Sequence, residues 1–134
     1  MITANSRRVL IAEDDPVISR LVVHLVQKQQ YKAVLMTDGG AAYRLLQTDA
    51  DFCGAIFDMN MPNLDGIDVI RFMRTENRLM RIPVMMVTAN RDLSLMADSF
   101  AAGVTLFLPK PFTAEQFEST FRLLLQNQRP RNKN

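Results

Sequence analysis

Two hydrophobic patterns alternate along the chain. Short apolar runs rich in β-branched and aromatic residues are bounded by polar residues, and in the segments between them apolar side chains recur every three or four positions. The first pattern is typical of buried strands and the second of amphipathic helices. The runs that predict strands are Val9–Ala12, Ala33–Met36, Ala55–Phe57, Val84–Val87 and Leu106–Leu108.

The segments that follow these runs each carry one apolar stripe at helical spacing, which predicts five helices. In chain order the stripes are Val17, Ile18, Leu21, Val22, Leu25 and Val26; Ala41, Ala42, Leu45 and Leu46; Ile67, Ile70 and Met73; Met96, Phe100 and Ala101; and Phe117, Phe121, Leu124 and Leu125. Apolar strands that alternate with helices favour a parallel sheet. The sequence therefore predicts a doubly wound α/β fold, a five-stranded parallel sheet with helices on both faces.

Residues that start and stop helices fit this pattern. Asp15 followed by Pro16 predicts a helix start in which Asp15 is the N-cap. Thr113 and Gln116 have the spacing of a capping box. Gly103 suits the C-terminal end of the fourth helix.

The length and composition indicate one domain. The chain has 134 residues, of which 48% are hydrophobic, which is enough for one substantial core. Residues 7–127 hold the alternating pattern and are the predicted domain. Residues 1–6 are then an N-terminal extension, and residues 128–134 are a tail or the start of a linker.

The charge pattern argues against direct nucleic-acid binding by this chain. The formal net charge is only +2, and no dense basic stripe with interleaved aromatic residues is present. No apolar run approaches the roughly 20 residues of a membrane helix, and the first residues do not resemble a signal peptide. The single cysteine, Cys53, has apolar neighbours and is expected to be a packed thiol. We therefore expect a cytoplasmic protein without a membrane segment.

Polar residues gather where the predicted strands end. Glu13 and Asp14 follow the first strand, Asp58 the third and Thr88 the fourth, and Lys110 lies just past the fifth. Ligands of doubly wound sheets bind beyond the carboxyl ends of the strands. These carboxylates, the hydroxyl and the ammonium are therefore expected to converge at one edge of the sheet.

This set of groups suits phosphoryl transfer onto an aspartate. Crowded carboxylates need a cation to stay ionised, and oxygen ligands without His or Cys favour Mg²⁺. A lysine and a threonine hydroxyl can bind phosphate oxygens. Taken singly, Asp15 is a helix cap, Asp58 a loop residue and Lys110 a surface lysine. The carboxylates, Thr88 and Lys110 together occupy the ends of four strands, and this placement favours a site.

The residues at these strand ends match a known family. The chain resembles the receiver domain of bacterial two-component response regulators, including the single-domain chemotaxis regulators, over roughly residues 7–127. The stretches that carry the resemblance are VLIAEDD from Val9, IFDMNMPNLDG from Ile56, VMMVTA from Val84 and FLPKPF from Phe107. The resemblance implies the flavodoxin-like version of the predicted fold.

The resemblance also implies the roles of the acidic residues. Asp58 matches the phosphoacceptor. The metal ligands would be Asp14, Asp58, Glu13 and the main-chain carbonyl of Asn60, with Mg²⁺ (or Mn²⁺) as the ion. The first acidic position holds Glu13, where many relatives have Asp.

Further roles follow from the same resemblance. Lys110, Thr88 and Ala89 match the residues that bind the phosphoryl group, and Thr88 with Phe107 matches the switch pair. The peptide bond before Pro111 matches one that the family holds in the cis form. Asn60 and Asn90 match positions that tune the lifetime of the phosphorylated state.

The expected function is a signalling switch and not an enzyme with an external substrate, although the domain catalyses its own phosphorylation and dephosphorylation. A histidine kinase or histidine phosphotransfer protein would donate the phosphoryl group. A downstream target or a fused effector domain would respond, and the face of the fourth helix, fifth strand and fifth helix is a possible dimer surface.

Two other classes remain open at this point. An aspartate-based phosphohydrolase usually has a second Asp two residues after the first, where this chain has Asn60. A partner-binding pseudo-receiver lacks the acceptor or the lysine, and both are present. The only histidine, His24, is predicted to be a packed or half-exposed helix residue and not a ligand.

Overall fold

The computed structural model describes residues 6–126, so most of the predicted extension (1–6) and all of the predicted tail (128–134) lie outside the described residues. Within this range strands and helices alternate strictly. In chain order they are β1 (Arg8–Ala12), α1 (Pro16–Lys28), β2 (Lys32–Met36), α2 (Gly39–Leu46), β3 (Gly54–Asp58), α3 (Gly66–Thr75), β4 (Val84–Thr88), α4 (Leu93–Ala102), β5 (Leu106–Pro109) and α5 (Ala114–Gln126). The predicted elements are confirmed.

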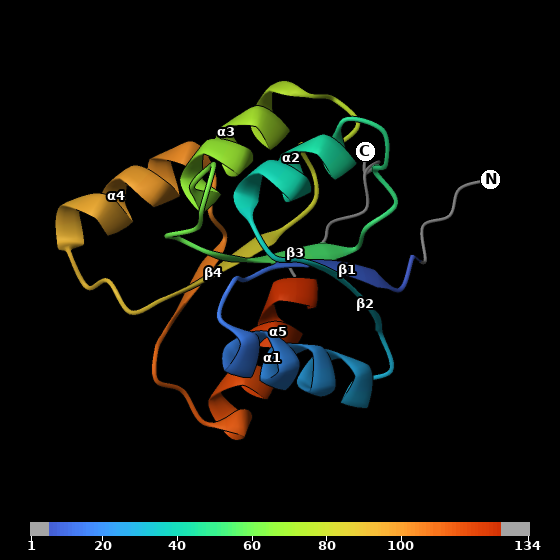
Figure 1. The fold of residues 1–134 in the computed structure, drawn as a ribbon, viewed down its shortest axis with the longest axis vertical. Helices are drawn as coiled ribbons and strands as arrows, with labels where there is room; N and C mark the ends of the chain where they lie inside the picture. Colours follow the sequence, from blue (N-terminus) through green and yellow to red (C-terminus); the bar gives the residue numbers. More distant parts are fainter. Residues whose placement is uncertain (1–5, 127–134) are drawn as a thin grey trace.

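The strands form one parallel sheet in the order β2-β1-β3-β4-β5. Helices α1 and α5 cover one face and α2, α3 and α4 cover the other (Figure 1). A separate hydrophobic cluster fills the space on each side of the sheet. The central strands β1, β3 and β4 are almost fully buried, whereas the edge strands β2 and β5 are partly exposed. The predicted doubly wound α/β fold is therefore confirmed.

The predicted stripe of α4 is shifted by one position. Phe100 is 51% exposed and Ala101 is exposed, while Ser99 is the fully buried residue of this helix. The Ser99 hydroxyl donates to the carbonyl of Leu95 at 2.8 Å, so a small polar side chain can face the interior. Apolar periodicity pointed to the wrong face because the inward residue of α4 is polar.

The stripe of α1 is also narrower than predicted. Val17 is 64% exposed and Leu21 36% exposed, whereas Val22, Leu25 and Val26 are buried. A helix on the face of a sheet buries only the side chains that point directly at the strands, so the flanking members of a broad stripe stay in contact with water. The stripes of α3 and α5 are confirmed.

Cap residues define the helix ends as the sequence predicted. The Asp15 carboxylate accepts hydrogen bonds from the main-chain N–H groups of Val17 and Ile18, at 2.8 and 3.1 Å. Thr113 and Gln116 form a reciprocal capping box, with distances of 2.9 and 3.0 Å. These bonds satisfy N–H groups that have no partner within the helix.

The C-terminal end of α4 is held by Arg74 of α3. The Arg74 guanidinium donates to the carbonyls of Met80 and Ile82 at 3.0 Å each, and to that of Gly103 at 2.8 Å. Gly103 ends α4 with φ of 115°, and a Cβ there would lie 2.5 Å from Arg74 Nε. The predicted glycine cap is confirmed, and its reason includes the close approach of Arg74.

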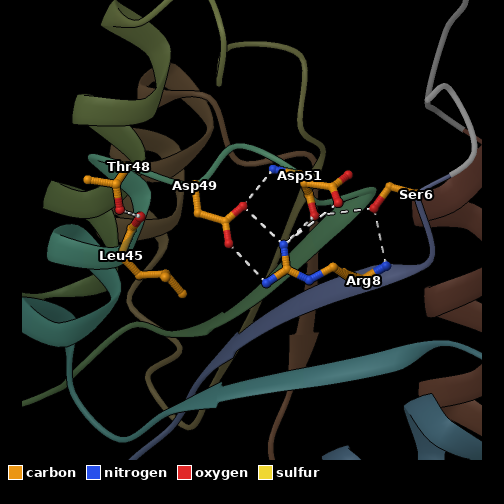
Figure 2. Close-up of polar contacts among 6 residues, drawn as sticks. All are labelled: Ser6, Arg8, Leu45, Thr48, Asp49 and Asp51. Carbon is orange, nitrogen blue, oxygen red and sulfur yellow. Dashed lines mark hydrogen bonds and ion pairs between the residues drawn. The ribbon is translucent and has the colours of Figure 1, made fainter. Parts of the chain in front are cut away.

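A second arginine ties the start of β1 to the loop before β3 (Figure 2). Both terminal nitrogens of Arg8 contact the Asp49 carboxylate, at 2.9 and 3.0 Å, and one donates to the carbonyl of Asp51 at 3.1 Å. The guanidinium also lies over the ring of Phe52, 4.5 Å from its centroid. The hydrogen bond to Asp49 is the main cause that raises the pKa of Arg8. This contact lies at the edge of the sheet where β1 begins, away from the edge formed by the carboxyl ends of the strands.

The helices of the described part of the chain are short. None within residues 6–126 is long and apolar enough to cross a lipid bilayer.

Candidate functional site

Four neighbouring strands bring polar side chains to one edge of the sheet. Asp58 and Thr88 are the last residues of β3 and β4, Glu13 directly follows β1, and Lys110 directly follows β5. Glu13 and Thr88 are each 3% exposed and Asp58 is 9% exposed. The edge predicted from the sequence is therefore a buried polar site.

Lys110 joins two of the carboxylates. Its Nζ lies 3.1 Å from Glu13 Oε1 and 3.5 Å from Asp58 Oδ2. The other oxygen of Glu13 accepts a hydrogen bond from the main-chain N–H of Asp15 at 3.2 Å. The side chains at the ends of β1, β3 and β5 thus lie together, as predicted.

Burial and crowding shift the protonation of this site. Burial, followed by the nearby Asp58 carboxylate, raises the pKa of Glu13 to about 7. Burial alone lowers the pKa of Lys110, but the Asp58 and Glu13 carboxylates outweigh it and leave the pKa above its ordinary value. Its neighbours therefore favour the charged form of Lys110, whereas burial and the Asp58 carboxylate favour the protonated form of Glu13.

Three carboxylates offer a site for a metal ion. Glu13, Asp14 and Asp58 each present an oxygen, and these oxygens lie within 4.8 Å of one another. Asp14 is exposed, so an ion could reach the three carboxylates from solvent. An all-oxygen donor set with excess negative charge fits a hard divalent cation. Asn60 lies two residues beyond Asp58 and is exposed, and the role of its carbonyl stays a prediction.

The loop after Asp58 is held close to β3 by a glycine. The N–H of Gly66 donates to the carbonyl of Met59 at 3.1 Å. A Cβ at Gly66 would lie 2.5 Å from the carbonyl oxygen of Asp58, so a side chain at this position would displace the loop. The sequence singled out Gly66 only as part of a motif, because this contact depends on how α3 packs.

Hydrogen bonds stabilise the loop after β4 and connect it to Lys110. The N–H of Asn90 donates to Thr88 Oγ1 at 3.0 Å, and the N–H of Lys110 donates to the carbonyl of Thr88 at 2.9 Å. Arg91 Nη2 donates to the carbonyl of Lys110 at 3.2 Å. Ala89 is exposed beside these residues. Sequence reasoning missed Arg91, since no motif marks its contact with the next loop.

Phe107 lies on β5 beside a small pocket. Its half-buried ring packs edge-to-face against Phe100 of α4, with centroids 5.0 Å apart and an interplanar angle of 70°. The pocket has a volume of about 80 Å³ and is lined by Thr88, Asn90, Arg91, Met96, Phe107 and Pro109. Thr88 and Phe107 therefore line the same pocket, and their role as a switch pair stays a prediction.

The remaining sequence predictions have clear outcomes. The peptide bond between Lys110 and Pro111 is cis, as predicted. Cys53 is buried, and burial raises the pKa of its thiol to about 11. His24 is an exposed residue of α1, outside the group of carboxylates described above.

Comparisons with known proteins agree with this geometry. The family model of the response regulator receiver domain matches residues 9–122. The chemotaxis protein CheY of Pseudomonas aeruginosa is 31% identical over 108 residues, which cover 81% of this chain and 87% of that protein.

Solved structures show the same fold. The chemotaxis response regulator CheY4 of Vibrio cholerae aligns with a TM-score of 0.83 at 27% identity, covering 90% of this chain and all of that one. The receiver domain of a sensor histidine kinase from Pseudomonas aeruginosa PAO1, solved with a magnesium ion coordinated in its active site cleft, aligns with a TM-score of 0.80 at 24% identity and covers 91% of this chain and 99% of that one.

The family model spans the strands from β1 to β5 and therefore includes every side chain of the buried site, from Glu13 to Lys110. With this coverage and the shared fold, the chain belongs to the response regulator receiver domain family.

Proposed function

We propose that this receiver domain is a switch in which the Asp58 carboxylate accepts a phosphoryl group from a histidine kinase or a histidine phosphotransfer protein. The contact of Lys110 Nζ with both Asp58 and Glu13 carries this proposal. It fixes a cation beside the one buried aspartate of the site, where negative charge develops on the incoming phosphoryl oxygens.

The transfer needs little from the protein beyond position and charge. An oxygen of Asp58 attacks phosphorus, a P–O bond forms, and the P–N bond of the phosphohistidine breaks with its electron pair leaving on the imidazole. Lys110, the hydroxyl of Thr88 and the main-chain N–H of Ala89 bind the phosphoryl oxygens. Asp58 and Thr88 are nearly excluded from water, so these contacts act at low dielectric.

Asp14, Asp58 and Glu13, with the main-chain carbonyl of Asn60, would hold one Mg²⁺ or Mn²⁺. When bound, the ion neutralises the carboxylates and the phosphoryl oxygens. The oxygens of the three side chains lie within 4.8 Å of one another, which supports this donor set. The magnesium in the related receiver domain from Pseudomonas aeruginosa also supports it.

Phosphorylation would change the surface through Thr88 and Phe107. When Thr88 turns toward the phosphoryl group, the ring of Phe107 can move into the pocket that they share. Phe107 contacts Phe100, so its movement alters the face of α4, β5 and α5. Leu93 and Phe100 on this face are 80% and 51% exposed, which suits a downstream target, a fused effector domain or a dimer partner.

The domain would also govern the lifetime of its own signal. Asn60 and Asn90 are short amides near the acceptor and leave room for an attacking water, so we expect the phosphorylated state to last minutes. Residues 7–127 form the proposed functional unit, acting in the cytoplasm without direct contact to nucleic acid. No enzymatic turnover of an external substrate is proposed, because Asn60 occupies the place of a phosphohydrolase's second Asp.

Intact-mass measurement tests the proposal. Incubation with acetyl phosphate and Mg²⁺ should add one phosphoryl group to the wild type and none to Asp58→Asn. Asp98→Asn, which changes an exposed carboxylate of α4, is the matched control and should be labelled like the wild type. Equal labelling of Asp58→Asn and the wild type would remove Asp58 from its role.

A further inference from the structure

Arg91 holds the main chain of Lys110 from the neighbouring loop. Its Nη2 donates to the carbonyl of Lys110 at 3.2 Å, while the N–H of Lys110 donates to the carbonyl of Thr88 at 2.9 Å. Both peptide groups that flank the Lys110 side chain are thus bonded to residues 88–91. The backbone of the lysine is fixed from the β4 side.

The direction of the Lys110 backbone decides where its ammonium group can go. A lysine side chain has four rotatable bonds, and fixing each of them has an entropic cost. Lys110 Nζ contacts Glu13 and Asp58 at 3.1 and 3.5 Å, so its stem must start in one direction to reach both. A backbone free to turn would spread the ammonium over more positions and lower its occupancy beside Asp58.

The loop that carries Arg91 provides a firm base for this contact. The N–H of Asp92 donates to the side-chain oxygen of Asn90 at 2.9 Å, and the N–H of Asn90 donates to Thr88 Oγ1 at 3.0 Å. The Asp92 carboxylate then caps α4 by accepting from the N–H of Ser94 at 2.9 Å. Arg91 therefore extends from a segment whose neighbours on both sides are fixed.

Within the described part of the chain, neither burial nor an ion pair accounts for the Arg91 side chain. It is exposed, and no carboxylate among residues 6–126 forms an ion pair with it. It therefore forms no salt bridge there. Besides lining the pocket beside Phe107, its side chain donates the hydrogen bond to the carbonyl of Lys110, and this bond suggests its role.

We propose that Arg91 is a positioning residue that keeps Lys110 directed at Asp58 during phosphoryl transfer. This inference rests on the proposed function of Lys110. Arg91 acts through the carbonyl of Lys110 and not through the phosphoryl group. Because the bond depends on the reach and shape of the guanidinium, positive charge alone does not replace it.

The rate of phosphorylation by acetyl phosphate with Mg²⁺, followed by intact mass, tests the role of Arg91. The hydrogen bond from Arg91 to Lys110 is exposed, so we expect Arg91→Ala to slow the rate only about two- to threefold, the low end for one net hydrogen bond. Arg91→Lys keeps the charge but replaces the guanidinium by a shorter side chain with a different donor geometry, so it should be as slow. Arg81→Ala, at an exposed arginine before β4, should match the wild type. Wild-type rates in Arg91→Ala or in Arg91→Lys would overturn the proposal.

A double-mutant cycle separates positioning from a general structural effect. Once Lys110 is replaced by alanine, adding Arg91→Ala should cause no further slowing, because there is no ammonium left to direct. Effects that multiply would overturn the positioning role. If Lys110→Ala alone leaves the rate unchanged, the proposed role of Lys110 fails and the inference fails with it. If Lys110→Ala is slow and Arg91→Ala is not, only the inference fails.

Discussion

Replacing Arg74 with methionine removes a guanidinium that holds three segments together. In the wild type it donates to Met80 and Ile82 in the loop before β4, and to Gly103 at the end of α4. Methionine keeps most of the aliphatic stem but supplies no donor. The change therefore isolates the hydrogen bonds from the packing of the side chain.

The size of the effect follows from the burial of the accepting groups. The bonds to Ile82 and Gly103 are partly buried, whereas the bond to Met80 is exposed and contributes little. A hydrogen bond from a charged donor contributes about 1.5–3 kcal/mol. Taking the lower value for the two partly buried bonds gives a loss of about 3 kcal/mol in the free energy of unfolding.

Urea unfolding measures this loss. With a slope of about 2 kcal/mol per molar, the midpoint should fall by about 1.5 M. Arg71→Met is the matched control on the same helix, because the one ion pair that Arg71 forms within residues 6–126 is an exposed pair with Asp68 at 3.3 Å. Its unfolding free energy should change by less than about 0.5 kcal/mol. Equal midpoints for the two variants would refute the assignment of Arg74 as the tie between α3 and α4.

Three further predictions concern the site. Because Glu13 has a pKa of about 7 and must lose its proton to bind a cation, Mg²⁺ affinity should fall as the pH drops below 7; titrations at pH 6 and pH 8 should show this dependence in the wild type and lose it in Glu13→Gln. Gly66→Ala should place a Cβ 2.5 Å from the carbonyl oxygen of Asp58 and lower stability by roughly 1–3 kcal/mol in thermal unfolding. Gly54→Ala should cost less, because the nearest atom to its Cβ is a side-chain carbon at 3.3 Å and the nearest main-chain atom lies at 3.9 Å; the reverse order would contradict the contact. The ring signals of Phe107 in NMR should shift when beryllofluoride mimics the phosphoryl group, and an unchanged ring environment would exclude the switch.

The sequence predicted that the polar side chains at the strand ends lie together, because the order of the strands along the chain determines which strand ends are neighbours. Each strand of a parallel sheet ends at the same edge, so locating the ends of β1, β3, β4 and β5 was enough to bring Glu13, Asp58, Thr88 and Lys110 together. Local signals such as the Asp15 cap were equally secure, because the donor and acceptor lie within a few residues.

Contacts between distant segments were not predicted, since periodicity carries no information about partners. The pairing of Arg8 with Asp49 joins residues 41 positions apart, and Arg74 reaches Gly103 across 29 positions. The inward face of α4 was missed for a different reason. Ser99 satisfies its own hydroxyl by bonding to Leu95, and this allows a polar residue to be buried where an apolar one was expected.

The buried serine of α4 has a consequence for how easily this helix is displaced. Ser99 is the one fully buried residue of α4, whereas α3 and α1 bury five and four residues. Little apolar surface therefore becomes exposed to water when α4 shifts. The free energy of local opening of α4 is expected to lie well below that of the other helices. A contact between Thr88 and the phosphoryl group then needs only a small free energy to displace α4. The amide hydrogens of α4 should exchange with deuterium before those of α3.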